Sequence, residues 1–289
     1  MQGLYYISVL CKAANLQKLS QGYGTRILPT TSMKRLLEIN ICLVFLFLYI
    51  PILVVVMFSF NSGDQIAVWE GFSLNWYAKL FKNPDVWRAC KNSLIIAGVA
   101  TFISTIIGTA AALAIEKYRF RIRTALTRVL YLPLIIPDIV LAIALLTFYV
   151  QVKFSRGLTS VILAHVVFNI AYVTIVVRAR LEGYDDTIEE AALDLGANRW
   201  QTFWRITFPL IAPGIIGGAL LAFTLSIDDF VITFFTAGVG STTLSVYIYS
   251  SLKYGITPEL NAISTMLLVN SIVFILLFLW FRGRNTQTS

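Results

Sequence analysis

Long apolar segments alternate with shorter polar ones along this chain. Each apolar segment is about 20 residues long, and a helix of that length, rising 1.5 Å per residue, crosses the roughly 30 Å hydrocarbon core of a bilayer. The apolar residues run continuously instead of alternating with polar ones, which favours helices over a transmembrane β-barrel. We therefore expect an all-α integral membrane protein with six transmembrane helices. The predicted spans are Ile39–Phe60, Leu94–Ile115, Val129–Val152, Leu158–Val177, Leu210–Phe235 and Ala262–Phe281.

The positively charged residues predict how these helices are oriented. Cytoplasmic loops of membrane proteins carry an excess of Lys and Arg. Of the 23 Lys and Arg residues, 16 precede the first span, lie between spans two and three or four and five, or follow the last span. Both termini are therefore expected in the cytoplasm. This bias accounts for the net charge of +8, and no basic patch with interleaved aromatic residues indicates nucleic-acid binding.

The composition supports the membrane prediction and narrows the possible chemistry. Hydrophobic residues make up 57% of the chain and charged residues 13%, with a mean hydropathy of +0.76, which argues against a soluble domain. Cys11, Cys42 and Cys90 have neither metal-site nor disulfide spacing and are interpreted as small apolar side chains. The single histidine, His165, is expected to be a hydrogen-bonded structural residue, because no Cys, Asp or Glu lies at ligand spacing. No metal site and no catalytic residue are predicted.

The chain is expected to divide at its first basic cluster. Residues 1–32 are weakly patterned, and we predict an N-terminal extension that is either disordered or not translated, with initiation at Met33. Residues 33–289 are expected to form the membrane-embedded part. The first external loop, 61–91, is predicted to contain a short helix at the membrane surface, since aromatic residues anchor there. The aromatic residues are Trp69, Phe72, Trp76 and Tyr77.

Small residues recur on one face of two predicted spans. Ser104, Gly108 and Ala112 are spaced four residues apart in the second span, and Gly214 and Gly218 have the same spacing in the fifth. Such faces allow helix backbones to approach closely, so tight helix packing is predicted at both.

A polar segment, TIEEAALDLGANRWQTFWRITFPL (residues 187–210), separates the fourth and fifth spans. Thr187 and Glu190 have the spacing of a capping box, in which each side chain binds the backbone amide of the other residue. Asn198 and Gln201 repeat this spacing. Two short helices are therefore predicted within the loop.

Each short helix carries an apolar stripe. The first helix is expected to end at Gly196, because glycine adopts the left-handed cap conformation without strain. The two stripes either lie in the membrane surface as an amphipathic hairpin, or are buried against the membrane domain or a soluble partner. They consist of Ile188, Ala191, Ala192 and Leu195, and of Trp200, Phe203, Trp204 and Thr207.

The same segment resembles the EAA loop of ATP-binding-cassette importer permeases, which has the pattern E-A-A-x3-G-x9-I-x-L-P. Phe208 stands where the usual Leu precedes the proline. The resemblance implies a type I importer permease fold whose loop, residues ~182–209, docks in a groove of a separate ATPase subunit and transmits its closure to the membrane helices. The matching residues, which become candidates for ATPase coupling, are Glu190, Ala191, Ala192, Gly196, Ile206 and Pro209.

The chain contains no G-x4-G-K-[ST] sequence, the phosphate-binding loop of many ATPases. ATP therefore has to be hydrolysed by another polypeptide. This chain is expected to be no enzyme and to bind no cofactor of its own.

Several stretches outside the loop resemble the permeases of spermidine/putrescine importers, most of all the second of the two permease subunits. The similarity runs from about Met33 through the last span, with the importer core at ~90–280. The resemblance implies a polyamine permease in the bacterial inner membrane that forms half of the pathway. The implied partners are a second permease subunit in a heterodimer, two ATPase subunits and an extracytoplasmic binding protein. The stretches are SFNSGDQIAVWEGFSLNWYAKLF, IIPDIVLAIALL, LAFTLSIDDFVITFF and YGITPELNA.

Two departures from this pattern lie in the last external loop, at Gly238-Val239-Gly240 and at Ser245. They bear on the contact with the binding protein and leave the fold prediction unchanged.

Three carboxylates within the predicted spans are candidates for the substrate pathway. Charged groups inside a membrane usually face the protein interior or a water-filled path, and carboxylates with aromatic faces suit a polycation. Asp138 is either a pathway residue or a helix cap after Pro137. Asp228 and Asp229 are either solvated at an early helix end, or one lines the path while the other holds a helix end, because successive residues point about 100° apart.

The helical rise predicts different depths for these acids. Counted from the inner face, Asp228 and Asp229 would lie ~29 Å along the fifth span and Asp138 ~13 Å along the third.

Two alternative functions stay open at this stage. The chain could be a permease for another solute, such as ferric ion or another organic cation. It could also be an ion-coupled secondary carrier in which the three acids relay protons. Such carriers often show inverted repeats, which this sequence lacks, and the carrier hypothesis leaves the EAA loop unexplained.

Overall fold

The computed structural model describes residues 31–64, 68–118, 120–254, 258–269 and 272. It separates into two compact units, Met1–Met57 and Phe58–Ser289. The regular elements of the described residues are helices, and their one β-contact is an isolated bridge between Asn61 and Phe72. Thirty residues of the predicted N-terminal extension, 1–30, lie outside the described part of the chain.

The first unit contains most of helix α2 (Thr31–Phe58). Every side chain from Glu38 to Val54 is exposed, although nearly all of them are apolar. A helix that is apolar all round has to be surrounded by lipid or by other helices. This matches the predicted first span.

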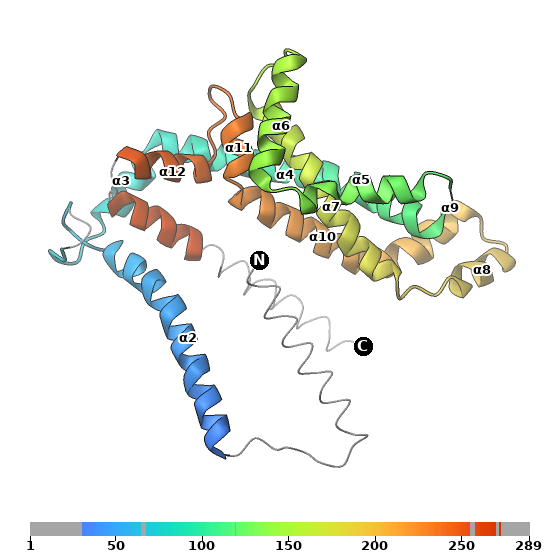
Figure 1. The fold of residues 1–289 in the computed structure, drawn as a ribbon, viewed down its shortest axis with the longest axis horizontal. Coiled ribbons are helices and arrows are strands. Elements are labelled where there is room, and N and C mark those ends of the chain that lie inside the picture. The colour runs from blue at the N-terminus through green and yellow to red at the C-terminus, as the bar shows by residue number, and fades with distance from the viewer. Residues whose placement is uncertain (1–30, 65–67, 119, 255–257, 270–271, 273–289) are drawn as a thin grey trace. The chain divides into compact units, whose positions relative to one another are not determined.

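The second unit is built on three helices that pack along one another, α4 (Pro84–Lys117), α7 (Leu158–Leu181) and α10 (Phe208–Asp228) (Figure 1). Their shared core consists of small and β-branched side chains, which allow the backbones to approach closely. The fully or nearly fully buried members are Ala112, Val173, Val177, Leu181, Ile211 and Ala222.

The predicted small-residue stripe of the second span lies in this interface. Ser104, Gly108 and Ala112 are all buried, and a Cβ added at Gly108 would lie 2.8 Å from Val173 and 3.1 Å from the Ile170 carbonyl oxygen. The Thr174 hydroxyl donates a hydrogen bond to the Gly108 carbonyl at 3.3 Å. The prediction of tight packing is confirmed here, because the backbone of α4 at Gly108 lies directly against Val173 and Thr174 of α7.

Two of the predicted spans are interrupted, each next to an aspartate. The third consists of α5 (Arg123–Ile135) and α6 (Asp138–Gln151), which meet at an angle of 111°. The fifth ends as a helix at Asp228, and a separate short helix, α11 (Val231–Thr236), follows. Both breaks have a local cause: Pro137 lacks a backbone N–H, and the backbone at Asp229 is extended.

At the end of the unit opposite the polar loop, α3 (Asn75–Lys82) and α12 (Leu244–Tyr254) pack with a helix at 258–269 (Figure 1). The short helix predicted in the first external loop is thus present as α3, and Trp76 and Leu80 fasten it to Leu260 and Ile263.

Four helices of the described residues are long and apolar enough to cross a membrane, and the bent pair α5–α6 makes a fifth candidate. The predicted sixth span, Ala262–Phe281, is described only over residues 262–269 and at residue 272. The remainder of it lies outside the described residues.

We expect Gly108→Ala to lower the stability of the purified protein by about 1–3 kcal/mol, because the added methyl group overpacks the α4–α7 contact. Gly98→Ala in the same helix is the matched control, since a Cβ there meets nothing within 4 Å. Melting temperatures in detergent, followed by size-exclusion chromatography, compare the two variants. Equal melting temperatures for both would show that the close approach does not limit the packing.

Candidate functional site

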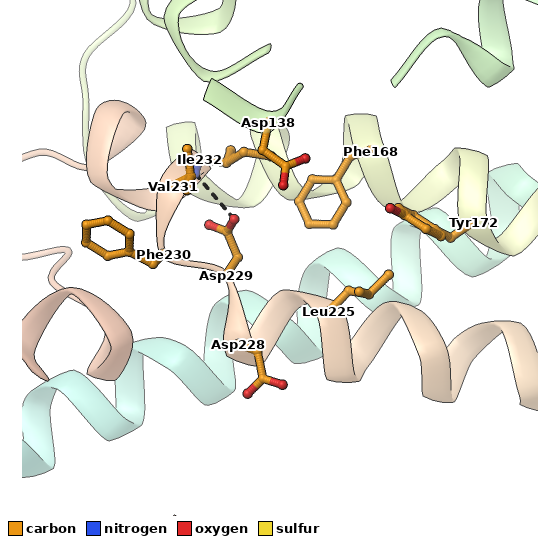
Figure 2. Close-up of a pocket in the computed structure, with 9 residues that line it drawn as sticks. All are labelled: Asp138, Phe168, Tyr172, Leu225, Asp228, Asp229, Phe230, Val231 and Ile232. Carbon is orange, nitrogen blue, oxygen red and sulfur yellow. Dashed lines mark hydrogen bonds between the residues drawn. The ribbon is translucent and has the colours of Figure 1, made fainter. Parts of the chain in front are cut away.

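The two helix breaks meet at one pocket of about 320 Å³ (Figure 2). All three acidic residues singled out from the sequence line it, although the helical rise along straight spans predicted different depths for them. That depth prediction was wrong, because the bend between α5 and α6 brings Asp138 beside the end of α10. The lining residues are Asp138, Phe168, Tyr172, Leu225, Asp228, Asp229, Phe230, Val231 and Ile232.

Asp229 holds the start of helix α11. Its carboxylate accepts hydrogen bonds from the backbone amides of Ile232 and Thr233, at 3.3 and 2.8 Å, and from the Thr233 hydroxyl at 2.9 Å. The side chain is 11% exposed. These donors would otherwise lack partners at a helix N-terminus, so Asp229 is the residue of the pair that secures a helix end.

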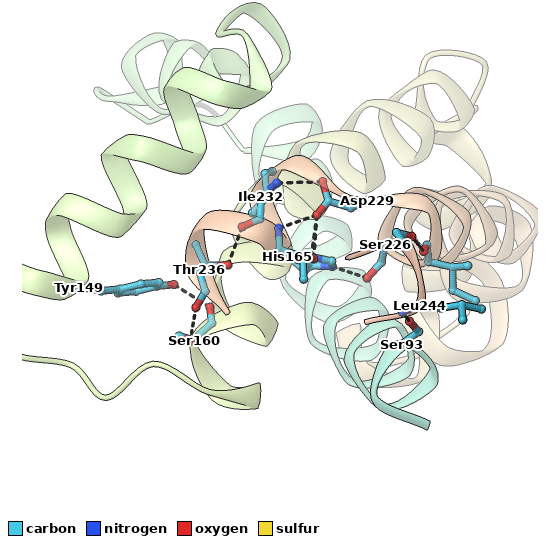
Figure 3. A network of polar contacts seen from close by, with 12 residues as sticks. Ser93, Tyr149, Ser160, His165, Ser226, Asp229, Ile232, Thr236 and Leu244 are labelled. Carbon is cyan, nitrogen blue, oxygen red and sulfur yellow. Dashed lines mark hydrogen bonds and ion pairs between the residues drawn. The ribbon is translucent and has the colours of Figure 1, made fainter. Parts of the chain in front are cut away.

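His165 supports Asp229 from helix α7 (Figure 3). The ring is fully buried, with Nε2 3.3 Å from Asp229 and 2.9 Å from the Thr233 hydroxyl, while Nδ1 lies 2.6 Å from the Ser226 hydroxyl. The prediction of a hydrogen-bonded histidine is confirmed. Through these contacts His165 joins α7 to the end of α10 and to α11.

A second polar contact fixes the far end of α11. The Ser160 hydroxyl lies 2.8 Å from the Thr236 carbonyl oxygen, and the Tyr149 hydroxyl donates to the Ser160 carbonyl at 2.9 Å (Figure 3). α11 is therefore attached at both ends, which keeps the pocket wall that it forms in place.

Asp138 is the first residue of α6 and follows the N-cap residue, Pro137. Among the described residues its carboxylate accepts no hydrogen bond from the first turn of α6, so the structure does not support the alternative of a helix cap. Figure 2 shows the Asp138 carboxylate pointing into the space that also contains the Asp229 carboxylate and the Phe168 ring. Two carboxylates that face one space repel each other, so the space favours a cation.

Asp228 differs from Asp229 although the two are adjacent. Its carboxylate points to the other side of the chain in Figure 2 and is exposed. Among the described residues no hydrogen bond or ion pair holds it. Asp228 also terminates α10, where the negative end of the helix dipole adds to its charge.

The aromatic side chains of the pocket were not predicted from the sequence. Phe168 and Tyr172 lie four residues apart on α7, which places them on one helix face, and Phe230 follows the aspartate pair. Aromatic faces bind cations. The spacing of Phe168 and Tyr172 was a detectable signal, but aromatic residues are common in membrane spans and a pattern of two does not single them out.

The polar loop folds as predicted in outline, with different capping at its start. Its first helix, α8 (Thr187–Asp194), lacks the predicted capping box, and Asp185 accepts the Thr187 amide at 3.0 Å in its place. Gly196 ends the helix with φ of +89°, as predicted. Its amide and that of Ala197 bind the carbonyls of Leu193 and Ala192, at 2.9 and 3.0 Å.

The second short helix runs directly into the fifth span. Helix α9 (Arg199–Thr202) begins with the predicted Asn198–Gln201 capping box, and a π-helical turn, η1 (Phe203–Thr207), leads on into α10. Ile206 lies in that turn, and Pro209 is in the first turn of α10. The backbone is therefore helical without interruption from α9 through η1 into α10.

The apolar stripe of α8 faces away from the rest of the chain. Leu195 is 90% exposed and Ile188 45%. The other predicted coupling residues of this helix behave alike: Glu190 and Ala191 are exposed, and Ala192 is half-buried. A folded, capped helix that presents apolar side chains to the outside is typical of a docking surface.

We expect Asp229→Asn to cost roughly 2–4 kcal/mol of stability, because one buried acceptor is lost and His165 loses its charged partner. Asp228→Asn, the matched control one residue away, should leave stability nearly unchanged. Melting temperatures of the two purified variants test this difference. Equal losses would mean that Asp229 does not secure α11.

Comparison with known proteins assigns the chain to a family. The model of the binding-protein-dependent transport system inner membrane component matches residues 104–285. The chain is 41% identical to the spermidine/putrescine transport system permease protein PotC of Haemophilus influenzae, over 81% of this chain and 91% of that protein. It is also 41% identical to the putrescine transport system permease protein PotI of Escherichia coli K12, over 84% and 90%.

Solved structures share the fold. A bacterial ABC transporter involved in import of the acidic polysaccharide alginate has a chain that matches with a TM-score of 0.67 at 20% identity, over 87% of this chain and 94% of that chain. The MetNI methionine ABC transporter has one with a TM-score of 0.56 at 18% identity, over 75% and 100%. With the family match over most of its length, this chain belongs to the inner-membrane permease components of binding-protein-dependent ABC importers.

Proposed function

We propose that this chain is one of two permease subunits of an ATP-driven importer of spermidine, putrescine or a related polyamine. The observation that carries the substrate class is the pocket at the two helix breaks, where Asp138 and Asp229 meet the ring of Phe168. Relatives at 37–41% identity carry the names of spermidine/putrescine and putrescine permeases. An extended polycation matches acidic groups flanked by aromatic faces.

The carboxylates of Asp138 and Asp228 would contact different parts of the transported molecule. Asp138 faces the pocket interior, whereas Asp228 points to the other side of the chain. A polyamine carries several ammonium groups along its length, so one molecule can meet acids that point in different directions. A partner permease that faces Asp228 would complete the pathway, in line with a heterodimer in the inner membrane.

We place both termini and the polar loop in the cytoplasm, with six membrane spans in the whole chain. The excess of Lys and Arg on the side of this loop supports that orientation. The exposed apolar stripe of α8 then faces the compartment that contains ATP. A separate ATPase subunit is the partner that would cover the stripe, with Glu190, Ala191 and Gly196 at the contact.

We expect Asp138→Asn and Asp228→Asn each to reduce polyamine uptake at least about tenfold, since removing one charge from a partly desolvated site costs of the order of 1.4 kcal/mol or more. Asp64→Asn, in the first external loop, is the matched control. Uptake of radiolabelled spermidine and putrescine by proteoliposomes containing the whole transporter measures the effect. Normal uptake by both single variants and the double variant would rule out an acidic pathway here.

We expect Glu190→Lys and Gly196→Asp to leave the chain in the membrane but weaken its association with the ATPase. The first places a cation at the positive end of α8, and the second forces a side chain into a backbone with φ of +89°. Co-purification of the ATPase with tagged permease is the measurement. Asp194→Asn, on the same helix, is the control, and full ATPase recovery with both test variants would exclude the docking role.

A further inference from the structure

Three elements converge on the carboxylate of Glu189. The Tyr184 hydroxyl, between α7 and α8, and the Thr207 hydroxyl, in η1, each donate to Oε1 at 2.5 Å. The Lys117 ammonium group, from the last turn of α4, forms an ion pair with the same oxygen and lies 4.5 Å from the centre of the Tyr184 ring. Glu189 therefore ties α8 to the ends of α4 and α10.

The protonation states of Glu189 and Tyr184 favour strong hydrogen bonds in this cluster. Burial raises the pKa of Glu189, but the hydrogen bonds from Lys117, Thr207 and Tyr184 outweigh burial and hold the pKa below its ordinary value. Burial and the neighbouring Glu189 raise the pKa of Tyr184 to about 12. At neutral pH Glu189 is thus charged, and Tyr184 keeps the proton that it donates.

The preceding residue of α4, Glu116, makes a separate set of contacts. Its Oε1 accepts a hydrogen bond from Nε of Arg178 on α7 at 2.6 Å and forms an ion pair with Nη2 of the same side chain at 2.5 Å. Its Oε2 lies 3.8 Å from Nη2 of Arg123, at the start of α5. Arg178 also donates a hydrogen bond to the Tyr131 hydroxyl of α5. Glu116 and Arg178 thus join α4, α7 and α5.

These polar contacts matter for α5 because the helix has no buried side chain of its own. It packs mainly against α7. At its other end lie the break at Ile136 and the start of α6, where Asp138 enters the pocket. The position of α5 therefore affects the position of the pocket acid.

We propose that Glu116 and Lys117 form a two-sided ionic joint through which movement of α8 reaches α5 and the Asp138 pocket. Neither residue touches the pocket, so both act as positioning residues. Adjacent helix residues point about 100° apart, which lets one turn of α4 hold α8 on one side and α7 with α5 on the other. The proposal rests on the proposed function in one respect, that α8 is moved by an ATPase.

If this joint operates, substitutions in it should lower the amount of polyamine transported per ATP hydrolysed without stopping ATP hydrolysis or unfolding the protein. In proteoliposomes with the complete transporter, Glu116→Gln and Lys117→Gln should reduce the polyamine transported per ATP hydrolysed by about tenfold, within the range usual for coupling between sites. ATP hydrolysis should continue. Glu182→Gln and Arg121→Gln are matched controls, because both residues are exposed at the same end of the bundle.

A reversible cross-link separates coupling from stability in one polypeptide. Lys117→Cys and Glu189→Cys are combined in a chain whose Cys11, Cys42 and Cys90 are Ser, and the new thiols are bridged with a bis-methanethiosulfonate reagent. Bridging should restore most of the transport per ATP. Cleavage with a reductant should remove it again without unfolding the protein.

The possible results distinguish the joint from the function on which it rests. A wild-type complex that takes up no polyamine and shows no stimulated hydrolysis overturns both. If the wild type transports normally, an unchanged transport-to-hydrolysis ratio in both Gln variants overturns the joint alone, and so does a cross-link without effect. A lower transport-to-hydrolysis ratio in the Gln variants, together with recovery of the ratio when the two introduced cysteines are bridged, supports the joint.

Discussion

The carboxylate of Asp229 stabilises the break between α10 and α11, on which the pocket depends. A helix that breaks within a membrane leaves backbone amides and carbonyls without partners, and lipid cannot supply them. Asp229 accepts two of the free amides of α11 and is itself supported by His165. Without this carboxylate, the amides at the start of α11 would lack partners, and the break after Asp228 would lower the stability of the fold. The pocket exists because the break is stabilised from inside the protein.

The close packing of α4, α7 and α10 provides the fixed frame around that break. Contact at Gly108 leaves no room for adjustment between α4 and α7, since a methyl group there would already meet Val173 at 2.8 Å. His165 and Ser160 belong to the same helix, α7, and attach α11 to this frame at both ends. The closely packed helices therefore hold the acidic residues at the breaks in fixed positions.

The loop at the other end of the bundle combines two kinds of surface. The apolar side chains of α8 point outward, whereas Glu189 on the same helix is held inward by three donors. Under the proposed function, a helix fastened in this way would pass a force on its outer face to the bundle. The π-helical turn joins the same region to α10 without interruption. Site and loop are therefore two ends of a connected set of helices.

The sequence by itself determined the class of protein, most of the spans, the helical loop with its end at Gly196, and the three acids of the pocket. These follow from local rules, namely apolar length, glycine conformation and the cost of a charge among apolar residues. Tertiary structure alone decided that α5 and α6 meet at 111°, that Asp138 lies beside Asp229, and that Glu189 binds Lys117. Glu189 and Lys117 are 72 residues apart in the chain. No local pattern marks such a pair, because the partners are selected by how whole helices pack.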